Sequence, residues 1–214
     1  MWRCVVCCAW LLWPLAVSAG PQREEHMADA VRNALRAAVA APGAPAVAEQ
    51  ADATAQDTWV QAMAPRWERW LQRHTSAGLA GVSSATEWAH ESVRREALQT
   101  IWYEARRAGL EPSLVLGLIE VESGFRKFAI SSAGARGLMQ VMPFWARSLG
   151  NGDVSVLFQL QANLRFGCVI LRHYLALEGG NLSMALGRYN GSRGQSAYPS
   201  AVLTAQRRWA QPAR

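Results

Sequence analysis

Apolar residues recur at helical spacing along the chain from residue 57 onward. After Asp57, the large apolar side chains fall on one face of a helix whose other faces carry charged residues, and these side chains are Trp59, Met63, Trp67, Trp70 and Leu71. This periodicity predicts an amphipathic helix. We interpret the tryptophan stripe mainly as core packing, and a platform for sugar rings is the alternative use of the same side chains.

Two further helices follow, and the second is apolar almost all round. The pattern predicts a helix from Glu91 to Ala108, closed by Gly109 at the position where a left-handed cap is expected. The segment from Pro112 to Ser123 offers no continuous polar face, so we expect a helix that is buried in the domain. The polar end of this helix, at Glu122, is therefore unusual.

The remainder of the chain predicts a loop and then more helices. A small-residue loop runs from Ser131 to Gly137, and the short apolar run that follows it ends at Pro143. A minor β element is expected here. Further helices are predicted at 157–177, at 182–188 with Asn181 as cap, and at 199–209, and they are separated by turn residues. The expected fold class is mainly α (α+β), a helical globule whose loops hold the site.

The first residues have the features of a targeting segment. Met1-Trp2-Arg3 carries a positive charge, residues 5–17 form an apolar run, and Val17-Ser18-Ala19 supplies small residues before Gly20. This order is typical of a secretory signal peptide cleaved after Ala19, which predicts an exported, periplasmic protein without stable membrane insertion after cleavage. A membrane anchor formed by residues 5–17 is the alternative, although the run is short for a span.

The next segment offers little to pack. Residues 20–56 are predicted to be an alanine-rich linker or N-terminal extension, with a weak helix at 27–41. The expected organisation is therefore a signal peptide at 1–19, this extension, and one folded domain at 57–214.

The charge and the cysteines narrow the class of partner. The formal charge is +6, which is compatible with an anionic polymer as partner. A basic motif with base-reading geometry is missing and export is predicted, so we expect no nucleic acid. Cys4, Cys7 and Cys8 fall in the predicted signal, and Cys168 is interpreted as a small buried hydrophobe. The histidines do not pair at metal-ligand spacing, so neither a metal nor another cofactor is expected.

Glu122 is the main candidate for acid–base chemistry. It ends the predicted buried helix, where partial desolvation and the negative end of the helix dipole both raise the pKa of a carboxyl group. A carboxylic acid that stays protonated near neutral pH can donate its proton to a leaving glycosidic oxygen. Glu120 is two residues away, which is a rotation of about 200° on a helix, so the two carboxyl groups cannot share one site.

A set of ordered motifs around Glu122 resembles the family 1 lytic transglycosylases, which carry the soluble-lytic-transglycosylase-like domain. These motifs are Glu122-Ser123-Gly124-Phe125, then Ser131, then Gly134-Ala135-Arg136-Gly137-Leu138-Met139-Gln140-Val141-Met142-Pro143, then Asn163 with Gly167, and Tyr189-Asn190-Gly191. The resemblance extends from about residue 91 to Tyr198. It implies a lysozyme-like transglycosylase fold. It also implies cleavage of the β-1,4 bond between N-acetylmuramic acid and N-acetylglucosamine in peptidoglycan strands, with formation of 1,6-anhydromuramoyl ends.

The resemblance also implies roles for individual residues. Glu122 would be the acid and base, and Ser123 would help to shape the turn after it. The residues expected to line the glycan cleft or to orient the glutamate are Ser131, Gln140, Met142, Tyr189 and Asn190. The third motif departs from the commoner Ala-Tyr-Asn-Ala-Gly by reading Arg188-Tyr189-Asn190-Gly191-Ser192, which leaves the reach of Arg188 open.

The scarcity of other carboxylates agrees with a one-carboxylate mechanism. Ordinary glycosidases need a second carboxyl group about 5 to 9.5 Å from the first, and after Glu122 the chain offers only Asp153 and Glu178, both interpreted as surface residues. We further expect Tyr189 to donate a hydrogen bond to Glu122, and Gln140 to offer its amide to the acetamido or hydroxyl groups of the substrate.

Two alternative functions remain open at this point. A hydrolase of the goose-lysozyme type resembles the same fold but releases a reducing end by adding water. A non-catalytic protein that binds peptidoglycan, for instance within a secretion assembly, would use the fold without cleaving the glycan. The presence of Glu122, Ser123 and Gln140 favours an enzyme over this binding protein.

Overall fold

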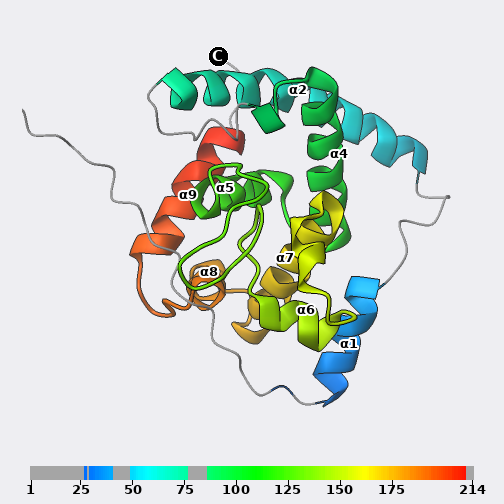
Figure 1. Ribbon diagram of the computed structural model, residues 1–214, viewed down its shortest axis with the longest axis vertical. Helices are drawn as coiled ribbons and strands as arrows, with labels where there is room; N and C mark the ends of the chain where they lie inside the picture. Colours follow the sequence, from blue (N-terminus) through cyan, green and yellow to red (C-terminus); the bar gives the residue numbers. More distant parts are fainter. Residues whose placement is uncertain (1–26, 28, 41–48, 77–85, 211–214) are drawn as a thin grey trace, which may run out of the picture.

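The computed structural model describes residues 27, 29–40, 49–76 and 86–210 of the chain, and these residues are mainly helical. The predicted signal peptide lies outside the described residues. Figure 1 shows the arrangement of the helices, which are α1 (Asp29–Ala40), α2 (Glu49–Ser76), α4 (Glu91–Arg107), α5 (Pro112–Glu122), α6 (Pro143–Leu149), the 3-10 helix η1 (Val154–Phe158), α7 (Leu160–Leu177), α8 (Leu182–Asn190) and α9 (Ala197–Ala210).

Helix α5 is the buried helix that the apolar pattern predicts. All residues from Pro112 to Ile119 except Ser113 are buried, and α9 packs against α5 along much of its length (Figure 1). Gly117 makes this close packing possible, because a Cβ atom at this position would stand 2.6 Å from the backbone nitrogen of Gln206. The two helix backbones therefore approach each other more closely than a side chain between them would allow.

Helix α4 packs on α5 and α2 packs on α4, and α2 begins at Glu49, before the predicted start at Asp57. Trp67 is fully buried, and Trp70 and Met63 are nearly so. For these residues, core packing is thus the correct interpretation of the stripe. Trp59, near the start of the stripe, is only partly buried.

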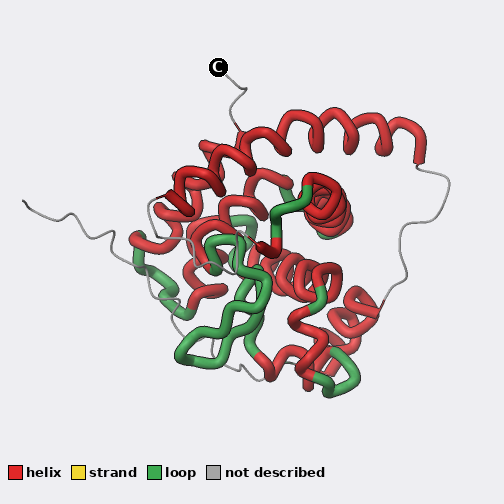
Figure 2. Tube along the Cα trace, turned by 45° about the horizontal axis from the view of Figure 1, so that its top comes forward, coloured by secondary structure: helices red, strands yellow, loops and turns green. Residues whose placement is uncertain are grey.

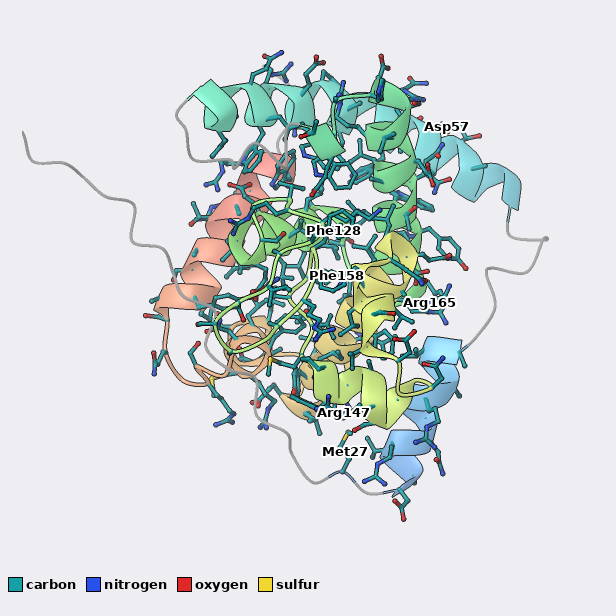
Figure 3. All side chains as sticks on the ribbon, in the orientation of Figure 1. Met27, Asp57, Phe128, Arg147, Phe158 and Arg165 are labelled. Atoms are coloured by element: carbon teal, nitrogen blue, oxygen red, sulfur yellow. The ribbon has the colours of Figure 1, made fainter. Side chains whose placement is uncertain are left out.

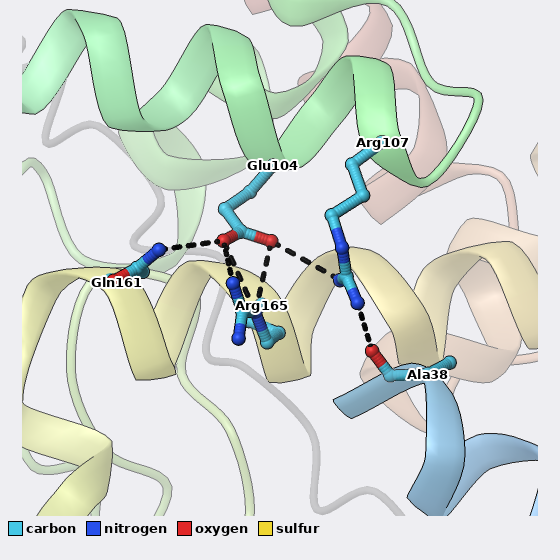
Figure 4. Close-up of polar contacts among 5 residues, drawn as sticks. All are labelled: Ala38, Glu104, Arg107, Gln161 and Arg165. Carbon is cyan, nitrogen blue, oxygen red and sulfur yellow. Dashed lines mark hydrogen bonds and ion pairs between the residues drawn. The ribbon is translucent and has the colours of Figure 1, made fainter. Parts of the chain in front are cut away.

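A buried ion cluster joins α4 to α7 and, through a backbone carbonyl, to α1. The side chain of Glu104 on α4 has no solvent exposure, and its Oε1 atom accepts a hydrogen bond of 2.9 Å from Arg165 on α7. Arg107 contacts the Oε2 atom at 3.4 Å and also donates to the carbonyl oxygen of Ala38 on α1 (Figure 4). A buried carboxylate is tolerated here because two guanidinium groups compensate its charge.

Helix α1 lies within the segment that the sequence analysis interprets as a linker. The weak helix expected at 27–41 is present, Leu35 on it is buried, and it packs on α6 and α7. Arg36 adds a hydrogen bond of 2.8 Å to the carbonyl oxygen of Ser148. This helix therefore packs on the same body as the rest of the fold, while the boundary of the domain at residue 57 stays a prediction.

The connection between α5 and α6 contains the minor β element that was expected. Antiparallel bridges pair Ile130 with Arg136 and Arg136 with Val141, within the loops that Figure 2 shows in green. Among the described residues these are isolated bridges rather than strands, which confirms the mainly α fold class. Pro143 ends the apolar run as expected, but it also begins α6, a helix that the sequence analysis did not predict. Proline suits the first turn of a helix because it lacks a backbone N–H.

Three further features bear on function. Cys168 is a free, buried thiol on α7, as predicted, and its burial raises its pKa. Within the described ranges, three or more His, Cys, Asp or Glu residues do not come together in a way that would hold a metal ion. In those same ranges, every helix is too short or too polar to cross a membrane.

Candidate functional site

The candidate site is built on the turn that follows α5. Glu122 is the last residue of the helix, and the hydroxyl of buried Ser123 donates to the carbonyl oxygen of Ile119 at 3.1 Å. The next two residues, Gly124 and Phe125, both adopt positive φ angles, of 56° and 61°. Ser123 therefore shapes the turn, as expected, and the chain reverses sharply just behind the carboxyl group.

Phe125 is not a glycine, so its left-handed backbone conformation has to be stabilised by its surroundings. Its ring is fully buried among tryptophans, with ring centroids 4.9 Å from Trp67, 4.9 Å from Trp70 and 5.6 Å from Trp209. The indole N–H of Trp88 also donates to the Phe125 carbonyl oxygen at 2.6 Å. The aromatic core from α2 and α9 thus holds the turn that carries Glu122.

The carboxyl group of Glu122 lies in an environment that favours its protonated form. The residue as a whole is half-buried, but its Oε2 atom is buried and has no hydrogen-bond partner among the described residues. Burial raises the pKa of Glu122 to about 8, and a hydrogen bond from Tyr198 lowers the pKa by a smaller amount. At neutral pH this carboxyl group carries its proton and can act as a general acid.

The tyrosine that contacts Glu122 is not the one that the sequence analysis selected. Tyr198, at the start of α9, donates its hydroxyl hydrogen to the Oε1 atom of Glu122. The hydroxyl of Tyr189 donates instead to the carbonyl oxygen of Met139, at 2.7 Å. A hydroxyl has one hydrogen to donate, so the expected hydrogen bond from Tyr189 to Glu122 is wrong. Tyr189 remains close enough to contribute to the raised pKa of Tyr198.

Glu120 points away from Glu122, as the helical rotation predicts. Its carboxylate contacts Arg208 and accepts a hydrogen bond of 2.7 Å from the indole nitrogen of Trp209. Both partners belong to the last turns of α9, whereas Tyr198 belongs to its first turn. The two carboxyl groups therefore meet opposite ends of α9, and Glu120 has a structural role.

Met139 is the centre of the loop that carries the glycine-rich motif. Its backbone N–H donates to the Oδ1 atom of Asn163 at 2.8 Å, and its carbonyl oxygen is the acceptor for Tyr189. The Nδ2 atom of Asn163 donates to the carbonyl oxygens of Arg136 at 2.9 Å and Leu157 at 2.8 Å. Asn163 thus holds three backbone groups of the loop and of η1 in one place.

Two glycines of the motifs permit this packing. A Cβ atom at Gly137 would lie 2.3 Å from the Nδ2 atom of Asn163, and one at Gly167 would lie 2.4 Å from the sulfur of Met139. Gly137 also has a positive φ angle of 76°. The spacing of glycine, asparagine and glycine in the motifs therefore follows from the packing of α7 against the loop.

Gln140 is buried and has a positive φ angle of 48°. Its Nε2 atom donates to the carbonyl oxygens of Ala129 at 3.2 Å and Gly137 at 2.9 Å. Both amide hydrogens are therefore used inside the loop. The amide group therefore has a scaffolding role that the motif alone did not reveal, and the expected contact of Gln140 with substrate stays a prediction.

The other candidate residues lie in different parts of the loop system. The Oγ atom of Ser131 accepts a hydrogen bond of 3.1 Å from the backbone N–H of Ala135 and so closes the loop. Met142 occupies the N-cap position of α6 without a capping hydrogen bond and is half-buried against the core. Asn190 is the last residue of α8, and its buried Nδ2 atom has no hydrogen-bond partner in the part of the chain that the structure describes. Asn190 therefore keeps a donor group unused next to Tyr189.

The loop also exposes an aromatic pair. Phe128 is more than half exposed, and its ring centroid lies 6.1 Å from that of Phe158 in η1 (Figure 3). The ammonium group of Lys127 lies 5.4 Å from the Phe128 ring, and the guanidinium group of Arg136 lies 5.5 Å from the Phe158 ring. These cation–π contacts hold positive charge along this side of the loop.

The remaining carboxylates named in the sequence analysis have structural partners. Glu178 accepts hydrogen bonds from Arg188 at 2.8 Å and Arg193 at 2.7 Å, and these hydrogen bonds lower its pKa to about 2. Asp153 caps η1 by accepting a hydrogen bond of 2.8 Å from the Ser155 N–H. The reach of Arg188, which the altered third motif left open, is therefore towards Glu178.

Tyr198 is the residue of the candidate site that sequence reasoning missed. It lies 76 residues after Glu122, and nothing in the local pattern distinguishes it from a core tyrosine. The available signal was its place just before Pro199, directly ahead of the last predicted helix. That signal becomes informative only once α9 is known to pack against α5.

Comparisons with known proteins identify similar chains. A family model described as the transglycosylase SLT domain matches residues 99–206, just over half of the chain. The membrane-bound lytic murein transglycosylase C of Actinobacillus pleuropneumoniae is 53% identical over 55 residues, which cover 25% of this chain and 15% of that protein. The transglycosylase of Enterobacteria phage PRD1 is 33% identical over 112 residues, which cover 49% of this chain and 41% of that protein.

A solved structure is also similar. An inactive mutant of the lytic transglycosylase Slt from Pseudomonas aeruginosa matches with 21% identity and a TM-score of 0.43, over 92% of this chain and 33% of that one. The matched segment thus spans less than half the length of each of these relatives.

Proposed function

Since the chain belongs to the transglycosylase SLT domain family, we propose that it is a lytic murein transglycosylase. It cleaves the β-1,4 bond between N-acetylmuramic acid and N-acetylglucosamine and leaves 1,6-anhydromuramoyl ends. The observation that carries this proposal is the buried carboxyl group of Glu122, whose pKa of about 8 keeps it protonated at neutral pH. The partner is the peptidoglycan glycan strand, and the site of action is the periplasm.

The first step is a proton transfer from Glu122. Its carboxyl group donates a proton to the glycosidic oxygen, the bond from that oxygen to the anomeric carbon breaks, and the N-acetylglucosamine unit leaves with a free hydroxyl group. The positive charge on the muramoyl ring is stabilised by the acetamido group of the substrate. The hydrogen bond from Tyr198 orients Glu122 and stabilises the carboxylate that this step produces.

The second step returns the proton. The 6-hydroxyl group of the muramoyl unit attacks the anomeric carbon, its hydrogen passes to the Glu122 carboxylate, and the 1,6-anhydro ring closes without added water. One carboxyl group is sufficient for both steps. The engagement of Glu120 by Trp209, of Glu178 by arginines and of Asp153 in a helix cap supports this assignment.

The experiment that tests the proposal is mass spectrometry of the muropeptides that the protein releases from purified murein. We expect ends that are lighter by one water than reducing ends. Reducing ends instead would establish a hydrolase of the goose-lysozyme type, and the absence of products would favour a binding protein.

Glu122→Gln and Glu120→Gln form a matched pair for the catalytic assignment. We expect Glu122→Gln to lower the rate at least about 10²-fold, the lower range for general acid–base catalysis, while the helical circular dichroism spectrum and the binding to murein are retained. Glu120→Gln alters a carboxylate on the same turn and retains cleavage. Turnover by Glu122→Gln at the wild-type rate would remove Glu122 from the mechanism.

A further inference from the structure

A second concave site lies at the opposite end of α5 from Glu122. A pocket of about 420 Å³ is formed between α2, α4, the first turn of α5 and the last turn of α9, and its aromatic lining consists of Trp59, Trp102 and Trp209. An 11-residue helix is about 16 Å long, so the Glu111–Ser113 side of this tryptophan pocket lies well away from Glu122, while its wall at Trp209 reaches back to Phe125 behind the catalytic turn. We propose that the tryptophan pocket binds an N-acetylhexosamine unit of a glycan strand.

The aromatic part of the pocket suits a pyranose ring. One face of such a ring presents axial C–H groups, which pack on an indole ring through dispersion and burial of apolar area. Trp209 is already fixed, because its indole nitrogen donates to Glu120 and its ring contacts the edge of Phe125. Trp209 and Trp102 are only 4% and 8% exposed, so they form the floor of the pocket, and Trp59, which is only partly buried, offers the more accessible ring. Trp59, from the more exposed start of the stripe, forms a wall of the same pocket.

The polar part of the pocket distinguishes a sugar from a purely apolar ligand. Arg106 and Glu111 are exposed and line the pocket, and the Arg106 guanidinium lies 5.9 Å from the centroid of the Trp102 ring. Glu111 occupies the N-cap position of α5, but its side chain makes no capping hydrogen bond. A guanidinium donor and a carboxylate acceptor beside indole rings match the hydroxyl and acetamido groups of an N-acetylhexosamine.

The choice of ligand rests on the proposed function, because murein is built from N-acetylated hexosamines. A polymer held in the tryptophan pocket stays near Glu122 between cleavage events. Two binding sites on one protein raise the effective concentration of the strand at each site. The tryptophan pocket would therefore increase the retention of the enzyme on long strands without taking part in bond cleavage.

Binding is tested on the full chain carrying Glu122→Gln, labelled with 5-fluorotryptophan and titrated with tri-N-acetylchitotriose. The chain has ten tryptophans, and single Trp→Phe variants assign their fluorine resonances. We expect the resonances of Trp59, Trp102 and Trp209 to shift together and to saturate. The proposal is overturned if these three resonances stay unchanged up to the solubility limit of the sugar.

Two polar variants locate the interaction within the pocket. Glu111→Ala and Arg106→Ala should each lower the affinity for the sugar about tenfold, as read from the saturation of the shifts. This is the effect of losing one hydrogen bond to a charged group. Glu96→Ala is the matched control, because Glu96 is also exposed and lies on α4 outside the pocket. Equal affinity in all three variants would contradict the proposal. This measurement of binding does not depend on cleavage. The pocket could therefore fail to bind the sugar while anhydro products still form, and it could bind the sugar while no anhydro products form.

Discussion

The protonation state of Glu122 results from two opposed effects on its carboxyl group. Burial around the Oε2 atom disfavours the anion and raises the pKa, whereas the hydrogen bond from Tyr198 to the Oε1 atom favours the anion. A general acid needs the first effect to donate its proton, and a general base needs the second effect after it has done so. We therefore expect Tyr198 to act as a positioning residue, and its contribution can be measured.

We predict that Tyr198→Phe moves the alkaline limb of the pH profile to higher pH. The loss of the hydrogen bond removes the effect that lowers the pKa of Glu122, so the carboxyl group stays protonated beyond pH 8. The value of kcat should fall by about tenfold or more, because the orientation of the carboxyl group is lost. The measurement is kcat/KM on soluble murein fragments between pH 6 and pH 10.

Tyr189→Phe is the matched control for this prediction. It removes a buried hydroxyl that donates to the Met139 carbonyl oxygen, and the cost is about 1 kcal/mol of stability. The alkaline limb should stay where it is in the wild-type protein. A limb that moves equally in both variants, or in neither, contradicts a direct role for Tyr198.

Glu122 also links the stability of the fold to pH. The folded protein keeps the proton of Glu122 up to a pH of about 8, whereas the carboxyl group in the unfolded chain releases it near 4.5. Between these values the folded state binds more protons, so its stability falls as pH rises. We therefore predict that the melting temperature of Glu122→Gln, relative to that of wild type, rises steadily from pH 4.5 to pH 8. Above pH 8 the difference between the two melting temperatures should be constant. Differential scanning calorimetry would contradict this if the two curves ran parallel.

Residues differ in how far the sequence reveals their roles. Glu122 was predictable because its burial follows from the apolar helix that it ends, and that pattern is local. Tyr198 was not, because its contact joins residues 76 positions apart. Gln140 was recognised as a motif residue, but its hydrogen bonds to Ala129 and Gly137 depend on a loop conformation that no periodicity specifies.

At the level of elements, the contact of α5 with α9 brings Tyr198 to Glu122. The contact depends on Gly117, where a Cβ atom would lie 2.6 Å from the backbone of Gln206. Backbone atoms of a packed helix cannot move aside as a flexible side chain can. The distance between the two helices is therefore set by the absence of a side chain at residue 117.

We predict that Gly117→Ala destabilises the fold by about 1–3 kcal/mol, although alanine is intrinsically the better helix former. The alanine pushes α9 away from α5, so Tyr198 loses its contact with Glu122 and cleavage slows. Urea denaturation and the cleavage rate provide the measurements. Ser200→Ala, on the exposed side of α9, should leave both unchanged. A stable and fully active Gly117→Ala variant would show that the helices tolerate a wider separation.

Helices with a strong apolar period were predicted nearly to their ends, and the exceptions have physical reasons. Helix α4 begins at Glu91 and stops one residue before the predicted end. Helix α2 starts at Glu49 because its alanine-rich first turns extend a helix that the tryptophan stripe stabilises further on. Helix α6 was missed because Pro143 is compatible both with the end of one segment and with the first turn of the next.

At the level of the whole molecule, the Glu104 cluster connects helices that the sequence presents as unrelated. Glu104 is an isolated charge on the apolar side of α4, and only the fold reveals that Arg165 on α7 meets it. Arg107 extends the cluster to α1 by donating to the Ala38 carbonyl oxygen. The packing of the alanine-rich segment on the body therefore depends on tertiary contacts, which explains why its composition suggested a linker.

We predict that Glu104→Ala lowers the free energy of unfolding by about 3 kcal/mol, because it leaves the partly buried Arg165 and Arg107 guanidinium groups without a carboxylate. Loosening between α4 and α7 should also expose Cys168, a buried thiol close enough to Glu104 for the carboxylate to raise its pKa. Urea denaturation gives the first quantity, and thiol labelling at Cys168 followed by mass spectrometry gives the second. Glu96→Ala, on the exposed face of α4, should change neither. If Cys168 were labelled at the same rate in both variants, the cluster would not be what holds α4 against α7.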